Sequence, residues 1–245
     1  MRNVLITGGA AGLGRALTRH LAADDCRVTV ADIDHENGRC LAGERDNIAY
    51  VPLDVADPAA SDLASATDVY DIVICNAGIS ISGDFREIPF ADEERVFAVN
   101  TLGHIQLVKQ LLRTNRLTAD GRIAFICSAT VFFPFPIALA YAASKSALDG
   151  FAAALDAYLH GCGITVTRVY PGPMRTDHLR FYAGFDRGRG ADPERIAPVV
   201  IRGIMNRKRR VLPDSASRLL YLLSLVPGLL SRLAHNQYRD NLRER

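Results

Sequence analysis

A glycine-rich turn between a short apolar run and a helical segment constrains the fold of this chain more than any other feature. Residues 3–7 (Asn-Val-Leu-Ile-Thr) are apolar and partly β-branched, which predicts a buried strand of a parallel sheet. Gly8, Gly12 and Gly14 follow, and residues 15–23 have a helical pattern. The glycines allow the backbone to approach a pyrophosphate, which then rests on the helix N-terminus. The sequence therefore predicts a dinucleotide-binding turn.

The rest of the chain continues as alternating strands and helices. Further strands are predicted at residues 27–31, 48–53, 71–75, 122–127, 164–169 and 209–212, with helices at about 90–113 and 141–160. Such alternation predicts an α/β fold with a parallel sheet covered on both faces. The 245 residues suit one domain. We expect a single-domain, Rossmann-type doubly wound sheet over residues 1–213, with residues 214–245 as a helical C-terminal extension of that domain.

Polar and glycine residues gather where the predicted strands end. In an open parallel sheet, ligands bind beyond the carboxyl ends of the strands. The residues that directly follow a strand include Gly8, Asp32, Asp54, Asn76, Ala77, Gly78, Ser128, Pro171 and Gly172. Their coincidence at one edge predicts that the functional site lies there.

Asp32 bears on the choice of cofactor. It ends the second predicted strand, about 20 positions after the glycine turn, where a carboxylate binds the hydroxyls of the adenosine ribose. The same charge repels a 2′-phosphate, and Ala11 places no basic side chain in the turn to compensate. The sequence therefore favours NAD over NADP.

Tyr141 and Lys145 lie four residues apart in an alanine-rich helical run, so their side chains share one face. A free phenol titrates near pH ~10, and acid–base chemistry at neutral pH needs a lowering of about three units, or roughly 4 kcal/mol. The lysine and a cationic cofactor ring together are expected to provide it. Ser128 would add a hydroxyl for a substrate oxygen. The alternative is an ordinary helix with a snorkelling lysine, and the dinucleotide turn makes that alternative weaker.

Over residues 1–210 the chain resembles the short-chain dehydrogenase/reductase family. Residues 7–14 are similar to the family's T-G-x-x-x-G-x-G cofactor turn, and Asn76-Ala77-Gly78 to its N-A-G element. The catalytic tetrad of the family matches Asn100, Ser128, Tyr141 and Lys145. The resemblance implies cofactor contacts from Gly8, Ala11, Gly12, Leu13, Gly14, Asp32, Asp54, Val55, Asn76, Ala77, Gly78, Tyr141, Lys145, Pro171, Gly172 and Thr176.

The resemblance also implies a role for each catalytic residue. Tyr141 would exchange a proton with the substrate, and Lys145 would bind the nicotinamide ribose and lower the tyrosine pKa. Ser128 would orient the substrate oxygen, and Asn100 would hold a water in a proton relay. The alternative for Asn100 is that its amide satisfies the backbone at a helix bend. The family further implies a homodimer or homotetramer.

Composition excludes several other classes. The net charge of +2 gives no field that would favour nucleic acid. The five cysteines have no metal-ligand spacing, so no metal site is expected, and their odd, unpatterned number favours a reducing compartment. A strand begins almost at the N-terminus and leaves no room for a signal peptide. We therefore expect a cytoplasmic protein.

The sequence indicates less about the substrate than about the cofactor. The aromatic run at residues 131–137 predicts an apolar substrate, or else it packs the fold or a subunit interface. Residues 172–192 are expected to fold over the substrate. After the last predicted strand the chain departs from the family, with a basic cluster at 207–210 and an apolar run at 219–230 that is too short to span a bilayer. This tail would lie on a membrane surface, cap the substrate site or mediate assembly.

The leading hypothesis is an NAD-dependent oxidoreductase that transfers a hydride between the cofactor and a hydrophobic secondary alcohol or ketone. An NADP-dependent carbonyl reductase is the alternative within enzymes, and Asp32 separates the two. A non-catalytic dinucleotide-sensing protein on the same fold is the alternative outside enzymes.

Overall fold

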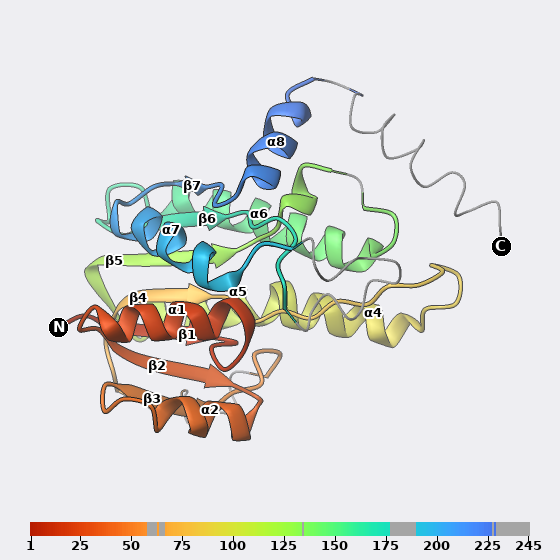
Figure 1. Ribbon diagram of the computed structural model, residues 1–245. Coiled ribbons are helices and arrows are strands. Elements are labelled where there is room, and N and C mark those ends of the chain that lie inside the picture. Colours follow the sequence, from red (N-terminus) through yellow and green to blue (C-terminus); the bar gives the residue numbers. More distant parts are fainter. Residues whose placement is uncertain (58–62, 64–66, 134, 177–189, 227, 229–245) are drawn as a thin grey trace.

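The computed structural model describes residues 1–57, 63, 67–133, 135–176, 190–226 and 228 (Figure 1). Within them, one seven-stranded parallel sheet has the order β3-β2-β1-β4-β5-β6-β7. The strands are β1 (Asn3–Thr7), β2 (Arg27–Asp32), β3 (Ile48–Pro52), β4 (Tyr70–Cys75), β5 (Leu117–Ile126), β6 (Thr165–Val169) and β7 (Arg210–Val211). The predicted single-domain Rossmann-type sheet is confirmed.

Helices connect the strands across both faces of the sheet. They are α1 (Gly12–Ala23), α2 (His35–Ala42), α4 (Phe90–Phe97), α5 (Gly103–Arg113), α6 (Leu139–Tyr158), α7 (Pro193–Met205) and α8 (Ser215–Ser224). The helix predicted at 90–113 is present, but a π-helical turn, η2 (Ala98–Leu102), separates α4 from α5. The sequence analysis missed α2 and α7, although each begins with an aspartate cap: Asp34 accepts from Asn37 N and Asp192 from Glu194 N.

The two faces of the sheet form two apolar cores. Val4 and Ile6 of β1 enter one core with α1, α2 and α7, whereas Leu5 enters the other with α5 and α6. Side chains of a strand alternate between faces, so a strand buried on both faces is apolar at every position. This explains why the strands are continuous apolar runs in the sequence.

The order of the strands reverses between β1 and β4. The chain builds outward from β1 to β3 and then returns to β4 on the other side of β1. This point is the usual ligand crevice of a doubly wound sheet. The segments that follow β1, β4 and β5 all leave the sheet at the same carboxyl edge, since the strands are parallel.

Candidate active site

The glycine turn has the backbone shape that the sequence predicts. Gly8 and Gly12 have φ of 63° and 51°, the left-handed region that favours glycine. Helix α1 begins after Ala11 without a side-chain cap, so its first amide groups point out of the helix unpaired by a side chain. Asp32 accepts from Ala10 N at 2.9 Å and thereby fixes the turn against the end of β2. These features fit a dinucleotide phosphate at the N-terminus of α1.

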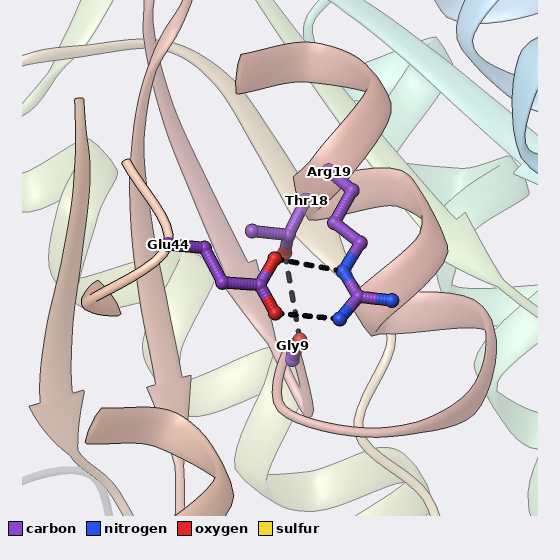
Figure 2. Close-up of polar contacts among 4 residues, drawn as sticks. All are labelled: Gly9, Thr18, Arg19 and Glu44. Atoms are coloured by element: carbon purple, nitrogen blue, oxygen red, sulfur yellow. Dashed lines mark hydrogen bonds and ion pairs between the residues drawn. The ribbon is translucent and has the colours of Figure 1, made fainter. Parts of the chain in front are cut away.

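Two contacts of α1 fix the helix behind this turn (Figure 2). The hydroxyl of Thr18 donates to the carbonyl oxygens of Gly14 at 2.9 Å and of Gly9 at 3.5 Å. On the outer face, the Arg19 guanidinium donates two hydrogen bonds to the carboxylate of Glu44, which follows α2. The hydrogen bond from Arg19 lowers the pKa of Glu44. Helix α1 is therefore held both to the turn and to the neighbouring βαβ unit.

The Asn76-Ala77-Gly78 segment is bonded directly to the first strand. The amide nitrogen of the Asn76 side chain donates to the carbonyl oxygens of Thr7 at 3.0 Å and Gly8 at 2.8 Å. In return, the Thr7 hydroxyl oxygen accepts from the backbone N–H of Asn76 at 3.0 Å and of Ala77 at 3.1 Å. These bonds join the ends of β1 and β4 and hold the glycine turn beside the predicted site.

His104, on α5, extends this network into the core. Its Nε2 lies 3.2 Å from the Thr7 hydroxyl oxygen and its Nδ1 lies 3.3 Å from the carbonyl oxygen of Asn100. Both lone pairs of the Thr7 oxygen already accept from Asn76 and Ala77, so His104 Nε2 cannot donate to it. We infer that Nε2 accepts from the hydroxyl and that Nδ1–H donates to Asn100. The neutral imidazole thus links the cofactor turn to Asn100.

Burial, together with the Lys145 ammonium, lowers the pKa of His104 to about 3. The unfolded chain therefore binds more protons at this residue below about pH 6.5, and stability must fall as the pH decreases. We expect a loss of about 1.5 kcal/mol between pH 6.5 and about pH 5 from this residue. Urea unfolding of His104→Gln should show a weaker dependence on pH in that range. The exposed His160→Gln should keep the wild-type dependence; equal slopes for all three proteins would contradict the assignment.

The side chain of Asn100 is fully engaged in backbone and hydroxyl contacts. It lies in the π-helical turn η2, where Oδ1 accepts from Ile79 N at 2.8 Å and Nδ2 donates to Ile79 O at 2.9 Å. Nδ2 also donates to Ser144 Oγ at 3.0 Å, and that hydroxyl donates to the carbonyl of Tyr141 at 2.8 Å. The amide therefore joins the segment after β4 to α6. The alternative, that it satisfies the backbone at a helix bend, stays a prediction, as does the place of Asn100 in a proton relay.

Ser128, Tyr141 and Lys145 meet beyond the ends of β4 and β5. Ser128 caps the 3-10 helix η3 (Ala129–Val131) and is hydrogen-bonded to the Tyr141 phenol. Lys145 Nζ donates to the carbonyl oxygen of Ile126 at 2.8 Å. A Cβ built on Gly78 would lie 3.3 Å from Lys145 Nζ and 3.2 Å from Asn100 Oδ1. The tetrad predicted from the sequence is thus one cluster next to the Asn76-Ala77-Gly78 segment.

The electrostatics of this cluster differ from the sequence-based expectation. Burial raises the pKa of Tyr141, and the hydrogen bond with Ser128 opposes this only in part. Burial also lowers the pKa of Lys145 to about 8, so its positive charge is itself weakened. Without a cofactor ring, the pKa of Tyr141 is raised. The desolvation cost of a buried phenolate exceeds the stabilisation that the Ser128 hydrogen bond supplies. The lowering expected from Lys145 and the cationic cofactor ring together stays a prediction.

The remaining predicted residues lie around the same edge. A Cβ on Gly12 would be 3.1 Å from Thr176 Cγ2, so Thr176 adjoins the glycine turn. Pro171 accepts from Ala129 N at 2.9 Å, which places it beside Ser128. Gly172 N donates to Asp214 Oδ2 at 2.8 Å. Residues 177–189, the greater part of the expected substrate loop, lie outside the described residues.

Asp54 and Val55 are held mainly by the α4–α5 side of the fold. Burial raises the pKa of Asp54, but hydrogen bonds from Arg95 at 2.6 Å and Ala56 N at 2.9 Å lower it more. Val55 is buried with its carbonyl against Gly103, where a Cβ would lie only 1.9 Å from the oxygen. Their predicted contact with adenine stays a prediction.

Some residues that hold the site were not found by sequence reasoning. His104, Ser144 and Asp214 make their key contacts with residues distant in sequence. Only Asp214 has a local signal, because it precedes α8 and caps it through Ser217 N at 2.8 Å.

The sheet order and the glycine turn define a Rossmann-type α/β protein. The family model described as short chain dehydrogenase matches residues 2–183 of this chain. The chain therefore belongs to the short-chain dehydrogenase family, a family of oxidoreductases.

Individual relatives agree with this assignment. The dehydrogenase/reductase SDR family member 7B of Bos taurus is 30% identical, over 96% of this chain and 81% of its own length. The cyclic-di-GMP-binding biofilm dispersal mediator protein of Escherichia coli K12 is 32% identical, over 72% of this chain and 74% of its own. A short-chain dehydrogenase from Sphingobium yanoikuyae, solved in complex with NADPH, aligns with a TM-score of 0.79 and 25% identity over 94% of this chain and 96% of that one.

Proposed function

We propose that this protein transfers a hydride between a nicotinamide cofactor and a hydrophobic secondary alcohol or ketone, with NAD as the preferred cofactor. The observation that carries the proposal is the cluster of Ser128, Tyr141 and Lys145 beside the glycine turn. Such a cluster places a proton donor next to the expected position of a dinucleotide.

Each residue of the cluster has a chemical task in this proposal. Ser128 holds the substrate oxygen, and Tyr141 gives it a proton or accepts one. Because burial keeps the phenol neutral, the protein itself is prepared to donate a proton to a ketone. Lys145 binds the ribose and favours the phenolate in the opposite direction. When bound, the nicotinamide exchanges the hydride and, in its oxidised form, adds positive charge beside the phenol.

The preference for NAD rests on Asp32. Its two carboxylate oxygens accept from Ala10 N at 2.9 Å and Asp34 N at 3.0 Å, so the negative charge is fixed at the end of β2. A 2′-phosphate at this place would be repelled. The NADPH complex of the Sphingobium yanoikuyae relative supports a nicotinamide cofactor but weighs towards NADP. Asp32 belongs to this protein itself and therefore gives the more direct support, which is for NAD.

Fluorescence titration with NADH and NADPH tests the cofactor preference. We expect the wild-type protein to bind NADH more tightly than NADPH. Asp32→Ala should weaken the binding of NADH by about tenfold and reduce the difference in affinity between NADH and NADPH. The ratio of the two dissociation constants is the readout, which a general loss of stability would not change. Tighter binding of NADPH by the wild type would overturn the NAD proposal.

Apolar side chains beside Tyr141 support a hydrophobic substrate. Phe135 and Ile137 pack with Tyr141 around the buried Ala138. In contrast, Phe132 packs inward, with its ring 4.8 Å from Tyr170 and 5.2 Å from Tyr221. Phe132 thus packs the fold, whereas Phe135 and Ile137 lie near Tyr141 and support an apolar substrate in this proposal. A panel of apolar secondary alcohols and their ketones, followed through NADH absorbance, tests the reaction class directly.

A cofactor-sensing protein without turnover is the second candidate. The Escherichia coli relative is named for binding a cyclic dinucleotide rather than for a reaction. A sensor has no use for the Ser128–Tyr141 hydrogen bond and the adjacent Lys145, which favour an enzyme. Turnover of any alcohol or ketone in the panel would show that the protein is an enzyme. Tight cofactor binding without turnover of any of these compounds would favour the sensor.

We also propose that the protein is a cytoplasmic homo-oligomer assembled through α4, η2 and α5. Phe90 and Leu102 are large apolar residues that are exposed on these elements. Sedimentation velocity of the wild type and of Phe90→Ser with Leu102→Ser tests the assembly. A wild-type protein that sediments as a single chain would contradict it.

A further inference from the structure

Helix α8 carries an apolar stripe on its outer side. Leu219, Leu222, Leu225 and Val226 expose 57%, 60%, 63% and 53% of their surfaces. Leu219 and Leu222 are three residues apart on α8 and share one helix face, and Leu225 and Val226 directly follow the helix. A contiguous exposed patch of large aliphatic side chains is a sign of an interaction surface.

The inner side of α8 is fixed to the rest of the fold. Tyr221 packs its ring against Phe132, and Asp214 joins the first turn of α8 to Gly172 through the bonds to Ser217 N and Gly172 N. In Figure 1, α8 rises from the end of β7 and stands clear of the sheet. The stripe is therefore held outward, next to the segments that carry the candidate site.

Exposed cations lie on α8 and just before it in the sequence. Lys208, Arg210 and Arg218 are exposed, and within the described residues none of them pairs with a carboxylate. Arg210 Nη1 lies 3.4 Å from the Tyr221 hydroxyl, which places that cation against α8 itself. Residues 207–245 contain nine Lys/Arg and three Asp/Glu, a net charge of +6, whereas the whole chain has +2 and the remainder therefore −4. The positive charge of this protein is therefore concentrated in the C-terminal part of its sequence, and Lys208, Arg210 and Arg218 lie in or just before α8.

We propose that α8 and its basic surroundings bind the surface of a membrane that contains anionic lipids. The helix lies in the plane of the interface, with the leucine stripe among the acyl chains and Lys208, Arg210 and Arg218 at the headgroups. Among the residues that the structure describes, no helix is long and apolar enough to cross a membrane, so the contact is one of lying on the surface. A second copy of this chain fits the stripe less well, because symmetric pairing would bring the two cationic surfaces together.

The test uses the full-length protein and co-sedimentation with vesicles of phosphatidylcholine, alone or mixed with phosphatidylserine. We expect binding to the mixed vesicles and a decrease of about tenfold or more without phosphatidylserine. Leu222→Ser with Leu225→Ser should lower binding to the mixed vesicles by at least about tenfold. Lys208→Gln with Arg218→Gln should lower it by a similar factor, and added salt should weaken the wild type.

The matched controls change residues that are also exposed but lie elsewhere on the protein. Val69→Ser removes an exposed apolar side chain and Arg45→Gln an exposed cation, and both should bind like the wild type. Leu219→Ser with Val226→Ser repeats the test if the first leucine pair fails to fold. Binding to neither vesicle, or binding that the leucine changes leave intact, overturns the proposal. So does a wild-type oligomer that Leu222→Ser with Leu225→Ser dissociates, since a second copy would then cover the stripe. None of these outcomes depends on cofactor or turnover.

Discussion

Tyr141→Phe should lower kcat by about 100- to 10,000-fold on the best alcohol or ketone of the panel, while NADH affinity stays close to that of the wild type. The substitution removes the hydroxyl that exchanges the proton with the substrate. It keeps the ring that packs with Phe135 and Ile137, so the site retains its shape. Steady-state kinetics together with fluorescence titration measure the two effects separately.

The same helix provides the control for that experiment. Tyr158 ends α6 and is 80% exposed, so Tyr158→Phe removes a phenol hydroxyl from the same element without touching the cluster. We expect wild-type kinetics from it. If Tyr141→Phe retained turnover as well, Tyr141 would not be the acid–base group.

Gly14→Ala should abolish detectable cofactor binding and destabilise the fold by about 2 kcal/mol or more. A Cβ at this position would lie 2.0 Å from the carbonyl oxygen of Gly8 and 2.6 Å from the side-chain nitrogen of Asn76. Both neighbours belong to the turn and to the segment that fixes it, so neither can move without changing the turn. NADH titration and urea unfolding report the two consequences.

Gly150→Ala is the matched control, because Gly150 also lies within a helix but a Cβ there meets nothing within 4 Å. It should leave cofactor binding unchanged and stabilise the protein by roughly 0.5–1 kcal/mol through the higher helix propensity of alanine. Unchanged NADH affinity in Gly14→Ala would show that the turn does not hold the cofactor.

Much of this architecture could be predicted from local patterns. The strands lie within a few residues of their predicted positions because burial on both faces makes them continuous apolar runs. The start of β5 at Leu117, five residues earlier than expected, is an exception, and its polar first half explains the error. The short α2 was missed because its signal is an aspartate cap rather than a long apolar repeat. Helix α7 was also missed, although it has both an aspartate cap and apolar residues at helical spacing, such as Ile196, Val200 and Ile204.

Part of the candidate site could likewise be predicted from the sequence, and part could not. Helix periodicity predicted that Tyr141 and Lys145 share one face, and parallel topology predicted that the glycine turn and Ser128 lie at the same edge of the sheet. Asn100 was predicted only from the family resemblance. The sequence could not predict that the phenol pKa is raised, because the cost of burying its charge depends on every atom around it. His104 was missed for a related reason. Its partner Thr7 is distant in the sequence, and its other contact is to the backbone carbonyl of Asn100, which has no sequence signal.

The sequence by itself determined the sheet and the nucleotide turn, because both follow from short-range periodicity and backbone sterics, and its family resemblance identified the clustered residues. The tertiary structure alone decided the protonation of Tyr141, the tautomer of His104 and the outward direction of the α8 leucines. These depend on desolvation and on hydrogen bonds between segments far apart in the chain, and neither is defined until the chain has folded.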